Sequence, residues 1–298
     1  MAQMASVDAY HAPSTLHDCL DILAREGERV AVIAGGQSLL PLLKTRGLRP
    51  KVLLDLANVD RLRTKKVLVD DGGLLEVGAM CRHRDLWSDP LIAGQWSALA
   101  DAAAGIGDRQ IQNRGTLGGN LAFGTVLTDM KQVVMCLSAE LMIAGPKDTR
   151  VVSALDLFGD PTRLLLEPGE LLQAVRFPSL GTGAGSAYGK YGITVNGRPV
   201  IGIAAMLRLD DTGVCSCARV VVGGLVPCPC EAKLAAQTLV GQRVDADVIG
   251  AAADTAAKEA NPQSDGRASS AYRRQLIRVL GRRVLELARK RAQESLGQ

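Results

Sequence analysis

The sequence has few aromatic and few histidine side chains. Its 298 residues include Phe 3, Trp 2 and Tyr 4, with three histidines and a formal net charge of +4. So few rings leave little on which nucleic-acid bases could stack, and a nearly balanced charge does not attract a polyanion. Three histidines also leave little capacity for general-base catalysis. We therefore expect no nucleic-acid partner and little acid–base chemistry in this chain.

Long apolar runs are absent as well. Charged residues interrupt every long apolar stretch, so no run of about 18 apolar residues exists and the sequence predicts no membrane span. The first residues, MAQMASVDAYHAPS, carry neither the basic nor the apolar segment typical of a secretory signal. The seven cysteines are an odd number, which argues for reduced thiols rather than a disulfide framework. We expect a cytoplasmic protein.

The hydrophobic pattern that is present predicts two domains of mixed helix and strand. The hydrophobic fraction of 47% and the length of 298 residues suit two cores. Helices are predicted over 14–26, 39–44, 95–104, 133–137, 231–260 and 269–291, and strands over 30–34, 51–56, 74–80, 140–144, 200–209 and 218–225. The polar segment 106–120 is predicted to be irregular. The glycine-rich stretch 178–189 is interpreted as the domain linker, with domains over 1–178 and 186–298 and residues 179–185 between them.

Two glycine-rich turns carry the strongest chemical signal. They are Gly35-Gly36-Gln37-Ser38 and Thr116-Leu117-Gly118-Gly119-Asn120. We expect each to present successive backbone N–H groups, and Ser38 to cap a helix whose N-terminus favours an anion. Two facing loops of this kind could bracket a diphosphate. Neither loop is a G-x-G-x-x-G or a G-x-x-x-x-G-K-[ST] motif, which disfavours a nicotinamide Rossmann domain and a P-loop.

Longer strings around these turns resemble a known family. They are AGGQSLLPLLK (34–44), VGAMCRHRDL (77–86), IGDRQIQNRGTLGGNLA (106–122), LLLEPGELLQAVRFP (164–178), AYGKYG (187–192) and DGRASSAYRRQLIRVLGRRVL (265–285). In order and spacing the chain resembles the FAD-binding medium subunit of the molybdenum hydroxylases, the family of xanthine dehydrogenase and carbon monoxide dehydrogenase. The likeness covers nearly the whole chain.

The resemblance implies a fold and a function. The fold would be α+β, with a two-lobed FAD-binding domain of the vanillyl-alcohol oxidase type followed by a smaller C-terminal domain of antiparallel strands plus helices. The chain would be the FAD-carrying electron-transfer subunit of a molybdenum-containing hydroxylase, an oxidoreductase subunit. Its partners would be a large molybdopterin subunit and a small subunit with two [2Fe-2S] clusters, in a doubled heterotrimer. Electrons would pass from the clusters to FAD and then to an external acceptor.

The resemblance also implies which residues bind FAD. By motif, the cofactor contacts are Ala34, Gly35, Gly36, Gln37, Ser38, Thr116, Gly118, Gly119, Asn120, Asp129, Leu166 and Lys190. Leu166 would pack on the flavin ring and Lys190 would hydrogen-bond it. Gln37 replaces a common histidine, which removes one point of covalent attachment, so we expect non-covalent FAD. The chain also departs from the family at Thr125-Val126 and Lys131-Gln132, where prolines are frequent.

Other features favour structural interpretations. The pairs Cys215/Cys217 and Cys228/Cys230 look superficially like a metal site, but residues i and i+2 of a strand share a face, so we expect small packed or edge cysteines and no metal. His83 is interpreted as structural. The basic C-terminal helix is interpreted as a solvated face, with docking to an acidic partner subunit as the alternative.

Two other functions stay open at this point. A self-sufficient flavin oxidase of the same fold superfamily would need a substrate pocket with its own base, and no His or Tyr cluster suggests one. A non-catalytic partner that has lost FAD is the second alternative. The intact glycines of both turns argue against it, and the departures at Thr125-Val126 and Lys131-Gln132 are the only hints in its favour.

Overall fold

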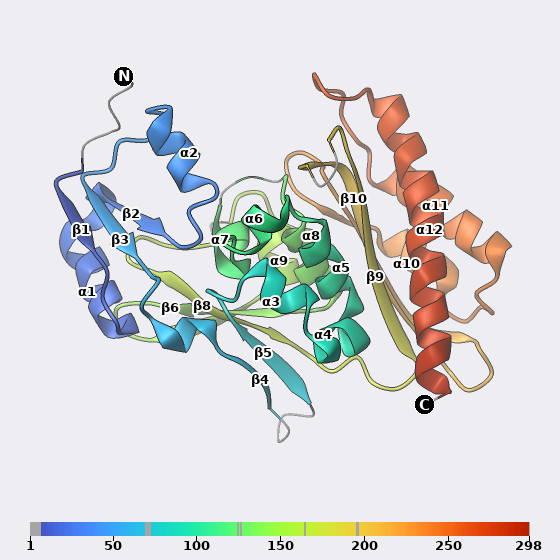
Figure 1. The fold of residues 1–298 in the computed structure, drawn as a ribbon. Coiled ribbons are helices and arrows are strands. Elements are labelled where there is room, and N and C mark those ends of the chain that lie inside the picture. Colours follow the sequence, from blue (N-terminus) through green and yellow to red (C-terminus); the bar gives the residue numbers. More distant parts are fainter. Residues whose placement is uncertain are drawn as a thin grey trace.

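Three sheets follow one another along the chain (Figure 1). The computed structural model describes residues 7–68, 73–123, 125, 127–163, 165–194 and 197–297. The position Val126 noted above lies outside the described residues. Among those that are described, no helix combines the length and apolarity that crossing a membrane requires.

The first sheet is small and parallel, in the order β1-β3-β2. This N-terminal lobe consists of β1 (Ala9–His11), α1 (Leu16–Glu26), a 3-10 turn (Gly27–Arg29), β2 (Val30–Ile33), α2 (Leu39–Lys44), β3 (Val52–Asp55) and a second 3-10 turn (Asp60–Arg63). The Thr15 side chain accepts a hydrogen bond from the Asp18 N–H and so starts α1. Cys19 on α1 packs with Leu54 on β3 in the core of this lobe. The predicted helices and strands of this region are confirmed.

The second sheet is antiparallel, in the order β4-β5-β8-β6-β7. Its strands are β4 (Lys65–Leu68), β5 (Leu74–Gly78), β6 (Glu140–Ala144), β7 (Thr149–Ser153) and β8 (Leu171–Phe177). The helices beside it are α3 (His83–Trp87), α4 (Pro90–Gln95), α5 (Ser97–Gly105), α6 (Arg109–Gln112), α7 (Leu117–Ala122), α8 (Met130–Cys136) and α9 (Ala154–Phe158). Trp96 is fully buried among them, and its indole N–H donates to the Pro178 carbonyl at 2.8 Å.

The prediction that 106–120 is irregular was wrong, because α6 and α7 fall within it. Asp108 caps α6 by accepting the Ile111 N–H at 2.8 Å, and Thr116 caps α7 by accepting the Gly119 N–H at 3.1 Å. A side-chain cap lets even a single helical turn persist between polar segments. Ser38 stands at the N-cap of α2 as predicted, but its side chain makes no capping hydrogen bond to the helix.

The third sheet is antiparallel, in the order β12-β11-β10-β9. Its elements are β9 (Ala184–Gly192), β10 (Pro199–Leu209), β11 (Cys215–Gly223), β12 (Cys230–Glu231), α10 (Lys233–Leu239), α11 (Ala246–Glu259) and α12 (Ser270–Leu296). Alternate residues of β10 face two cores. Ile203 and Ala205 pack with α11 and α12, whereas Ala204 and Met206 join the core of the second sheet. The third sheet is therefore packed on both faces, with α5 and α8 on the side of the second sheet.

Part of the stretch interpreted as a glycine linker is strand. Residues 184–189 belong to β9, and their glycines serve packing rather than flexibility. A Cβ on Gly185 would lie 2.2 Å from the Ala288 carbonyl oxygen, and one on Gly189 would lie 2.8 Å from the Val284 side chain. These glycines let α12 approach the strand closely. The segment 231–260 is likewise two helices, α10 and α11, rather than one.

Candidate functional site

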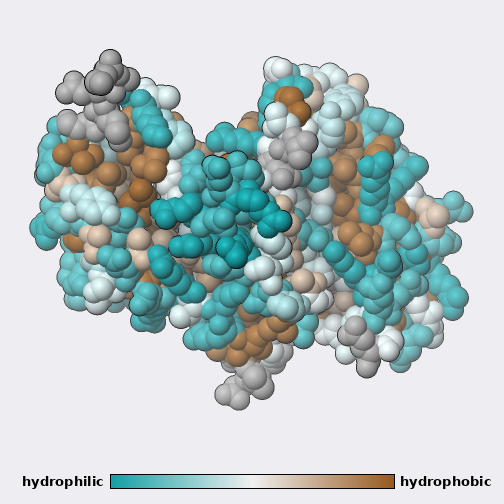
Figure 2. All heavy atoms as spheres, in the orientation of Figure 1, coloured by the Kyte–Doolittle hydropathy of each residue, from teal (hydrophilic) through white to brown (hydrophobic). Residues whose placement is uncertain are grey.

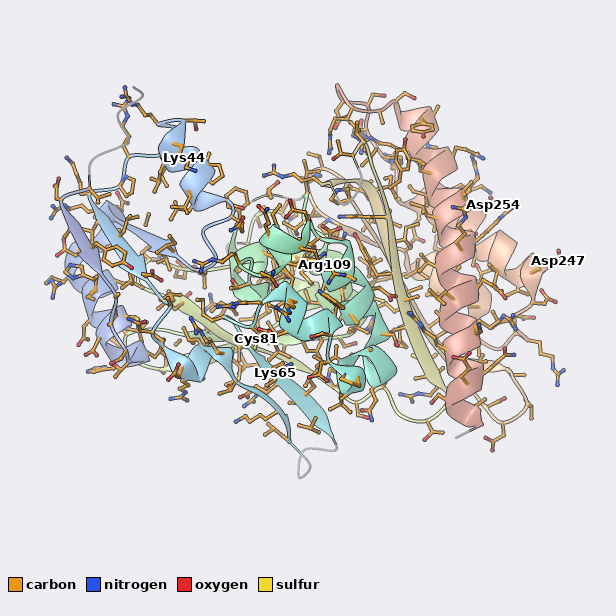
Figure 3. All side chains as sticks on the ribbon, in the orientation of Figure 1. Lys44, Lys65, Cys81, Arg109, Asp247 and Asp254 are labelled. Atoms are coloured by element: carbon orange, nitrogen blue, oxygen red, sulfur yellow. The ribbon has the colours of Figure 1, made fainter. Side chains whose placement is uncertain are left out.

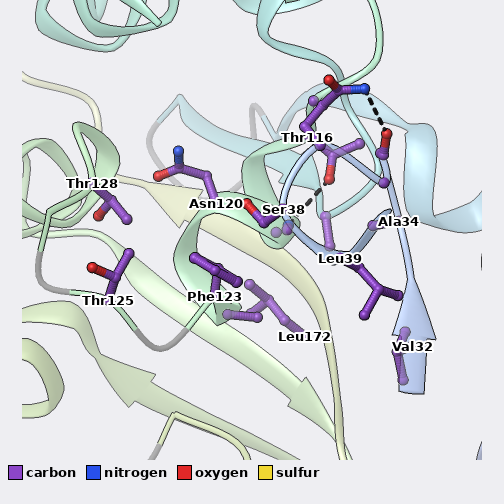
Figure 4. Close-up of a pocket in the computed structure, with 18 of the residues that line it drawn as sticks. Val32, Ala34, Ser38, Leu39, Thr116, Asn120, Phe123, Thr125, Thr128 and Leu172 are labelled. Carbon is purple, nitrogen blue, oxygen red and sulfur yellow. Dashed lines mark hydrogen bonds between the residues drawn. The ribbon is translucent and has the colours of Figure 1, made fainter. Parts of the chain in front are cut away.

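A cavity of about 740 Å³ lies between the N-terminal lobe and the helices of the second sheet (Figure 4). Its lining includes eleven of the twelve site residues predicted above: Ala34, Gly35, Gly36, Gln37, Ser38, Thr116, Gly118, Gly119, Asn120, Asp129 and Leu166. The twelfth, Lys190, is not part of the lining but forms an ion pair with Asp129 just behind it. Segments as far apart in sequence as β2 and β8 thus meet around one space.

At Gly35 the first glycine turn packs against the two residues just before the second turn. A Cβ on Gly35 would lie only 2.2 Å from the Arg114 carbonyl oxygen and 2.8 Å from the Gly115 Cα. Gly36 has a φ of +73°, a conformation that favours glycine. The backbone N–H groups of Gly36 and Gln37 have no hydrogen-bond acceptor within the part of the chain that the structure describes. Both residues line the cavity, so the first turn has free backbone donors beside it.

The second turn differs from the prediction. Its backbone N–H groups are already used: Gly118 donates to the Ala79 carbonyl at 2.8 Å, Gly119 to the Thr116 hydroxyl, and Asn120 to the Thr116 carbonyl at 3.0 Å. Gly118 is needed for close packing, because a Cβ there would lie 2.6 Å from the Ala79 Cβ. This turn offers side chains instead of the backbone, namely the Thr116 hydroxyl and the Asn120 amide.

Three polar atoms at the cavity are buried without any hydrogen-bond partner among the described residues. They are Asn120 Oδ1, Thr128 Oγ1 and His83 Nδ1, and all three residues line the cavity. Buried polar groups are normally hydrogen-bonded, so several unpartnered ones around one space indicate that a polar ligand completes them. A dinucleotide such as FAD, with its diphosphate and hydroxyls, fits this combination of free backbone donors and unpartnered side chains.

His83 and Thr128 were missed as site residues by the sequence analysis. The sequence analysis interprets His83 as structural. Its backbone N–H donates to the Gly115 carbonyl at 3.0 Å, and its ring packs against Gly115, just before the second turn. Burial lowers the pKa of His83 to about 4, so the ring is neutral near pH 7 and acts as a hydrogen-bonding group rather than a cation. Its position as the first residue of α3 gave no signal of this contact.

Asp129 is the centre of a buried polar network. Its Oδ1 accepts hydrogen bonds from the Tyr188 hydroxyl at 2.7 Å and from the Lys190 ammonium at 2.9 Å. Burial raises the pKa of Asp129, while Lys190 and Tyr188 oppose that rise. Lys190 also donates to the Gly197 carbonyl at 2.7 Å. The Gln132 amide donates to the Tyr188 hydroxyl at 3.2 Å, so this departure from the family pattern supports the network around Asp129.

The remaining lining is largely apolar. Side chains such as Val32, Leu56 and Leu172 cover this part of the cavity, where planar rings could pack. Among the described lining residues, Arg198 is the one Lys or Arg side chain, and its guanidinium lies 5.9 Å from the Phe123 ring centroid. An anionic ligand at the glycine turns would consequently be held by backbone N–H groups and neutral side chains rather than by cations.

The cysteine pairs do not gather. Cys215 is buried, Cys217 is exposed, and Cys228 and Cys230 are partly buried, with Cys230 at the start of β12. In the described part of the chain no three His, Cys, Asp or Glu side chains come together as metal ligands would. Burial raises the pKa of the Cys215 and Cys230 thiols to about 11, so both are protonated and unreactive thiols near pH 7.

Comparisons with known proteins agree on one family. The family model described as "FAD binding domain in molybdopterin dehydrogenase" matches residues 3–180, and the one described as "CO dehydrogenase flavoprotein C-terminal domain" matches residues 195–288. The chain is 32% identical over 283 residues to the carbon monoxide dehydrogenase medium chain of Afipia carboxidovorans, covering 95% of this chain and 97% of that one. It is 32% identical over 276 residues to the nicotine 6-hydroxylase medium subunit of Paenarthrobacter nicotinovorans, covering 93% and 95%.

A solved structure shows the same fold. A chain of CO dehydrogenase from Oligotropha carboxidovorans superposes with a TM-score of 0.89 at 31% identity, covering 97% of this chain and 99% of that one. These findings confirm the predicted fold class, a FAD-binding part followed by a C-terminal part of antiparallel strands plus helices.

Proposed function

The chain belongs to the FAD-binding flavoprotein subunits of the molybdopterin dehydrogenases, and on that premise we propose that it transfers electrons through FAD within such an oxidoreductase complex. Bound FAD can take up electrons singly and release them singly or in pairs, which suits a link between one-electron and two-electron carriers. This chain contributes the binding, orientation and shielding of that cofactor.

The observation that carries the proposal is the cavity at the two glycine turns. The free N–H groups of Gly36 and Gln37 would hold the diphosphate, and Asn120, Thr128 and His83 would complete their hydrogen bonds on the cofactor. The full set of proposed contacts is Ala34, Gly35, Gly36, Gln37, Ser38, Thr116, Gly118, Gly119, Asn120, Asp129, Leu166 and Lys190, together with His83 and Thr128. We propose that FAD is held without a covalent bond.

Lys190 is proposed to keep a positive charge beside the flavin ring. Asp129 and the Gly197 carbonyl hold its ammonium in place. Gly105 packs beside the Lys190 side chain, since a Cβ on Gly105 would lie 3.7 Å from Lys190 Cε. Leu166 lines the cavity and would pack on the ring. A fixed cation near the ring favours its electron-rich state, which suits a group that accepts electrons.

The partners proposed are those of the family. The relatives named above are medium chains or medium subunits, which implies larger and smaller chains beside them. We propose a large molybdopterin subunit that acts on the substrate, a small subunit with two [2Fe-2S] clusters, and a doubled heterotrimer. Within this chain, we propose a FAD-binding domain over 1–178 and a C-terminal flavoprotein domain over 186–298.

The make-up of the cavity favours an electron-transfer subunit over a self-sufficient oxidase. An oxidase needs a base that reaches its substrate. In the described lining, the one histidine is His83, which is fully buried, and the one carboxylate is Asp129, which is engaged by Tyr188 and Lys190. His83, whose pKa burial lowers to about 4, is a weak base, and Asp129 already accepts two hydrogen bonds.

Cofactor analysis of the assembled complex tests the proposal. The tagged chain, expressed together with its partner chains, is expected to co-purify with about one FAD, about one molybdenum and about four iron atoms, the content of two [2Fe-2S] clusters. FAD without iron or molybdenum would contradict the electron-transfer role and favour the oxidase. Absence of FAD would contradict both and favour a partner that has lost the cofactor.

A further inference from the structure

Four arginines gather on one exposed face beside the cavity. Arg82 is the N-cap of α3 and Arg84 lies in its first turn, while Arg109 begins α6 and Arg114 follows the end of that helix by two residues. We refer to these four residues as the arginine patch. All four side chains are exposed, and none forms an ion pair with a carboxylate of the described residues.

Several contacts hold the patch together. The Arg109 guanidinium lies 4.9 Å from the ring centroid of Trp87 on α3, and Arg84 is 3.5 Å from the Asn113 Oδ1 next to Arg114. Arg82 pairs with Thr116 in an isolated antiparallel bridge. Figure 3 labels Arg109 over the central helices, and Figure 2 shows strongly hydrophilic side chains gathered at that place on the same face.

The nearby carboxylates do not neutralise the patch. Asp85 Oδ2 accepts the backbone N–H of Arg82 at 3.1 Å, and Asp108 Oδ1 accepts the backbone N–H of Ile111 at 2.8 Å. Both acids are thus used to start α3 and α6 rather than to pair with guanidinium groups. Four guanidinium groups against two carboxylates leave this face positive.

The basic helix α12 differs in this respect, although the sequence made it the more conspicuous positive segment. Arg278 and Arg282 pair with Asp254, which Figure 3 labels on α11 beside α12. The Arg291 guanidinium is 2.6 Å from Asp101 on α5, and Arg289 pairs with Glu286. Most cations of α12 are therefore balanced within the chain itself, whereas those of the arginine patch are not.

The arginine patch is separated from the cavity by a single layer of chain. Gly107, Ile111, Gly115 and Thr116 lie between or beside the four arginines in sequence, and all of them line the cavity. Electron transfer weakens steeply with distance, so a protein that exchanges electrons with a group in this cavity has to dock close to it. The patch provides a positive docking face at that place.

We propose that the arginine patch docks the iron–sulfur partner subunit. This inference rests on the proposed function. A [2Fe-2S] cluster bound by four cysteine thiolates is anionic, and a partner face rich in Asp and Glu around it would match four unpaired guanidinium groups. Complementary charge orients two proteins on approach and is weakened by salt. Binding at this face would accordingly depend on ionic strength.

Charge reversal in the co-expressed complex tests the proposal. The double variant Arg84→Glu/Arg109→Glu leaves every cavity-lining residue in place, so FAD content reports an intact fold. The matched control is Arg243→Glu, an exposed arginine in the loop between α10 and α11. A third variant, Arg283→Glu, probes the exposed face of α12. Iron retained per FAD is measured on the tagged chain during washes of rising salt, starting near 0.15 M.

The expected result is selective loss of iron. The double variant should retain FAD but bind the iron-containing chains about tenfold more weakly or worse at about 0.15 M salt, while the Arg243→Glu and Arg283→Glu variants behave as wild type. Retention of iron by the double variant through the same salt range would overturn the proposal. Loss of iron from the Arg283→Glu variant but not from the double variant would overturn it as well. Intact iron with slower reoxidation of the flavin would overturn it too, because the patch would then serve the external acceptor. Iron missing from the wild type would instead contradict the proposed function itself.

Discussion

Replacing Gly35 by alanine should separate the two glycine turns and release the cofactor. The added Cβ would lie 2.2 Å from the Arg114 carbonyl oxygen, whereas ordinary contact begins at 3.4 Å, so the turns must move apart by about 1.2 Å. Gly35 does not have a positive φ, so the clash and not backbone strain causes the shift. Overpacking of this kind costs about 1–3 kcal/mol of stability.

The effect on FAD binding should be larger than the effect on folding. A shift of that size breaks hydrogen bonds from the first turn to the diphosphate, and each bond to a charged group contributes about 1.5–3 kcal/mol. FAD affinity should therefore fall by about 10- to 150-fold for each bond lost. Fluorescence titration of the stripped chain with FAD measures the affinity, and urea unfolding measures the stability.

Gly94→Ala is the matched control. Gly94 lies on the exposed side of α4, and a Cβ there would have no neighbour within 4 Å. The same substitution should keep FAD affinity unchanged and raise stability by about 0.5–1 kcal/mol, because alanine is the better helix former. If Gly35→Ala binds FAD as tightly as wild type, the assignment of the diphosphate to these turns is refuted.

Three further predictions concern polar groups around the cavity. Lys190→Met leaves Asp129 as an uncompensated buried charge, so the free energy of unfolding at pH 7 should fall by about 3–5 kcal/mol. Because burial raises the pKa of Asp129, its carboxyl takes up a proton as the pH is lowered, and the deficit should shrink in a urea-unfolding series at falling pH. Asn120→Leu removes an unpartnered buried oxygen, so a thermal melt of the FAD-free chain should show undiminished stability while titration shows FAD affinity reduced by about tenfold. Burial lowers the pKa of His83 to about 4 from 6.5, so between these pH values the unfolded chain binds a proton that the folded chain does not. The free energy of unfolding of the wild type should therefore fall by up to about 3 kcal/mol between pH 6.5 and 4, and that of His83→Phe should fall by that much less in the same unfolding series.

Local sequence patterns were enough to find the glycine turns. The dipeptides Gly35-Gly36 and Gly118-Gly119 stand out in the sequence, and a Cβ on Gly119 would lie 3.5 Å from the Ala34 Cβ, which agrees with the expectation that the turns face each other. The long strands and helices also carried clear periodicity. The family resemblance added the order of these elements, which no local pattern contains.

The errors concern contacts between distant segments. The sequence predicts a free backbone N–H at Gly118, but this N–H donates to the Ala79 carbonyl, and no residue near position 118 in the sequence indicates that acceptor. The glycines at 185 and 189 read as a flexible linker because the helix that packs on them follows a hundred residues later. Such partners are set by the packed fold and not by neighbours in the chain.

The most direct test of the central claim is the visible spectrum of the purified chain, followed by denaturation and identification of the released chromophore. The account predicts a yellow protein that releases about one FAD per chain into solution, without a flavin left on the polypeptide. A colourless protein that stays colourless after incubation with FAD would contradict the claim that the cavity between the two glycine turns holds this cofactor.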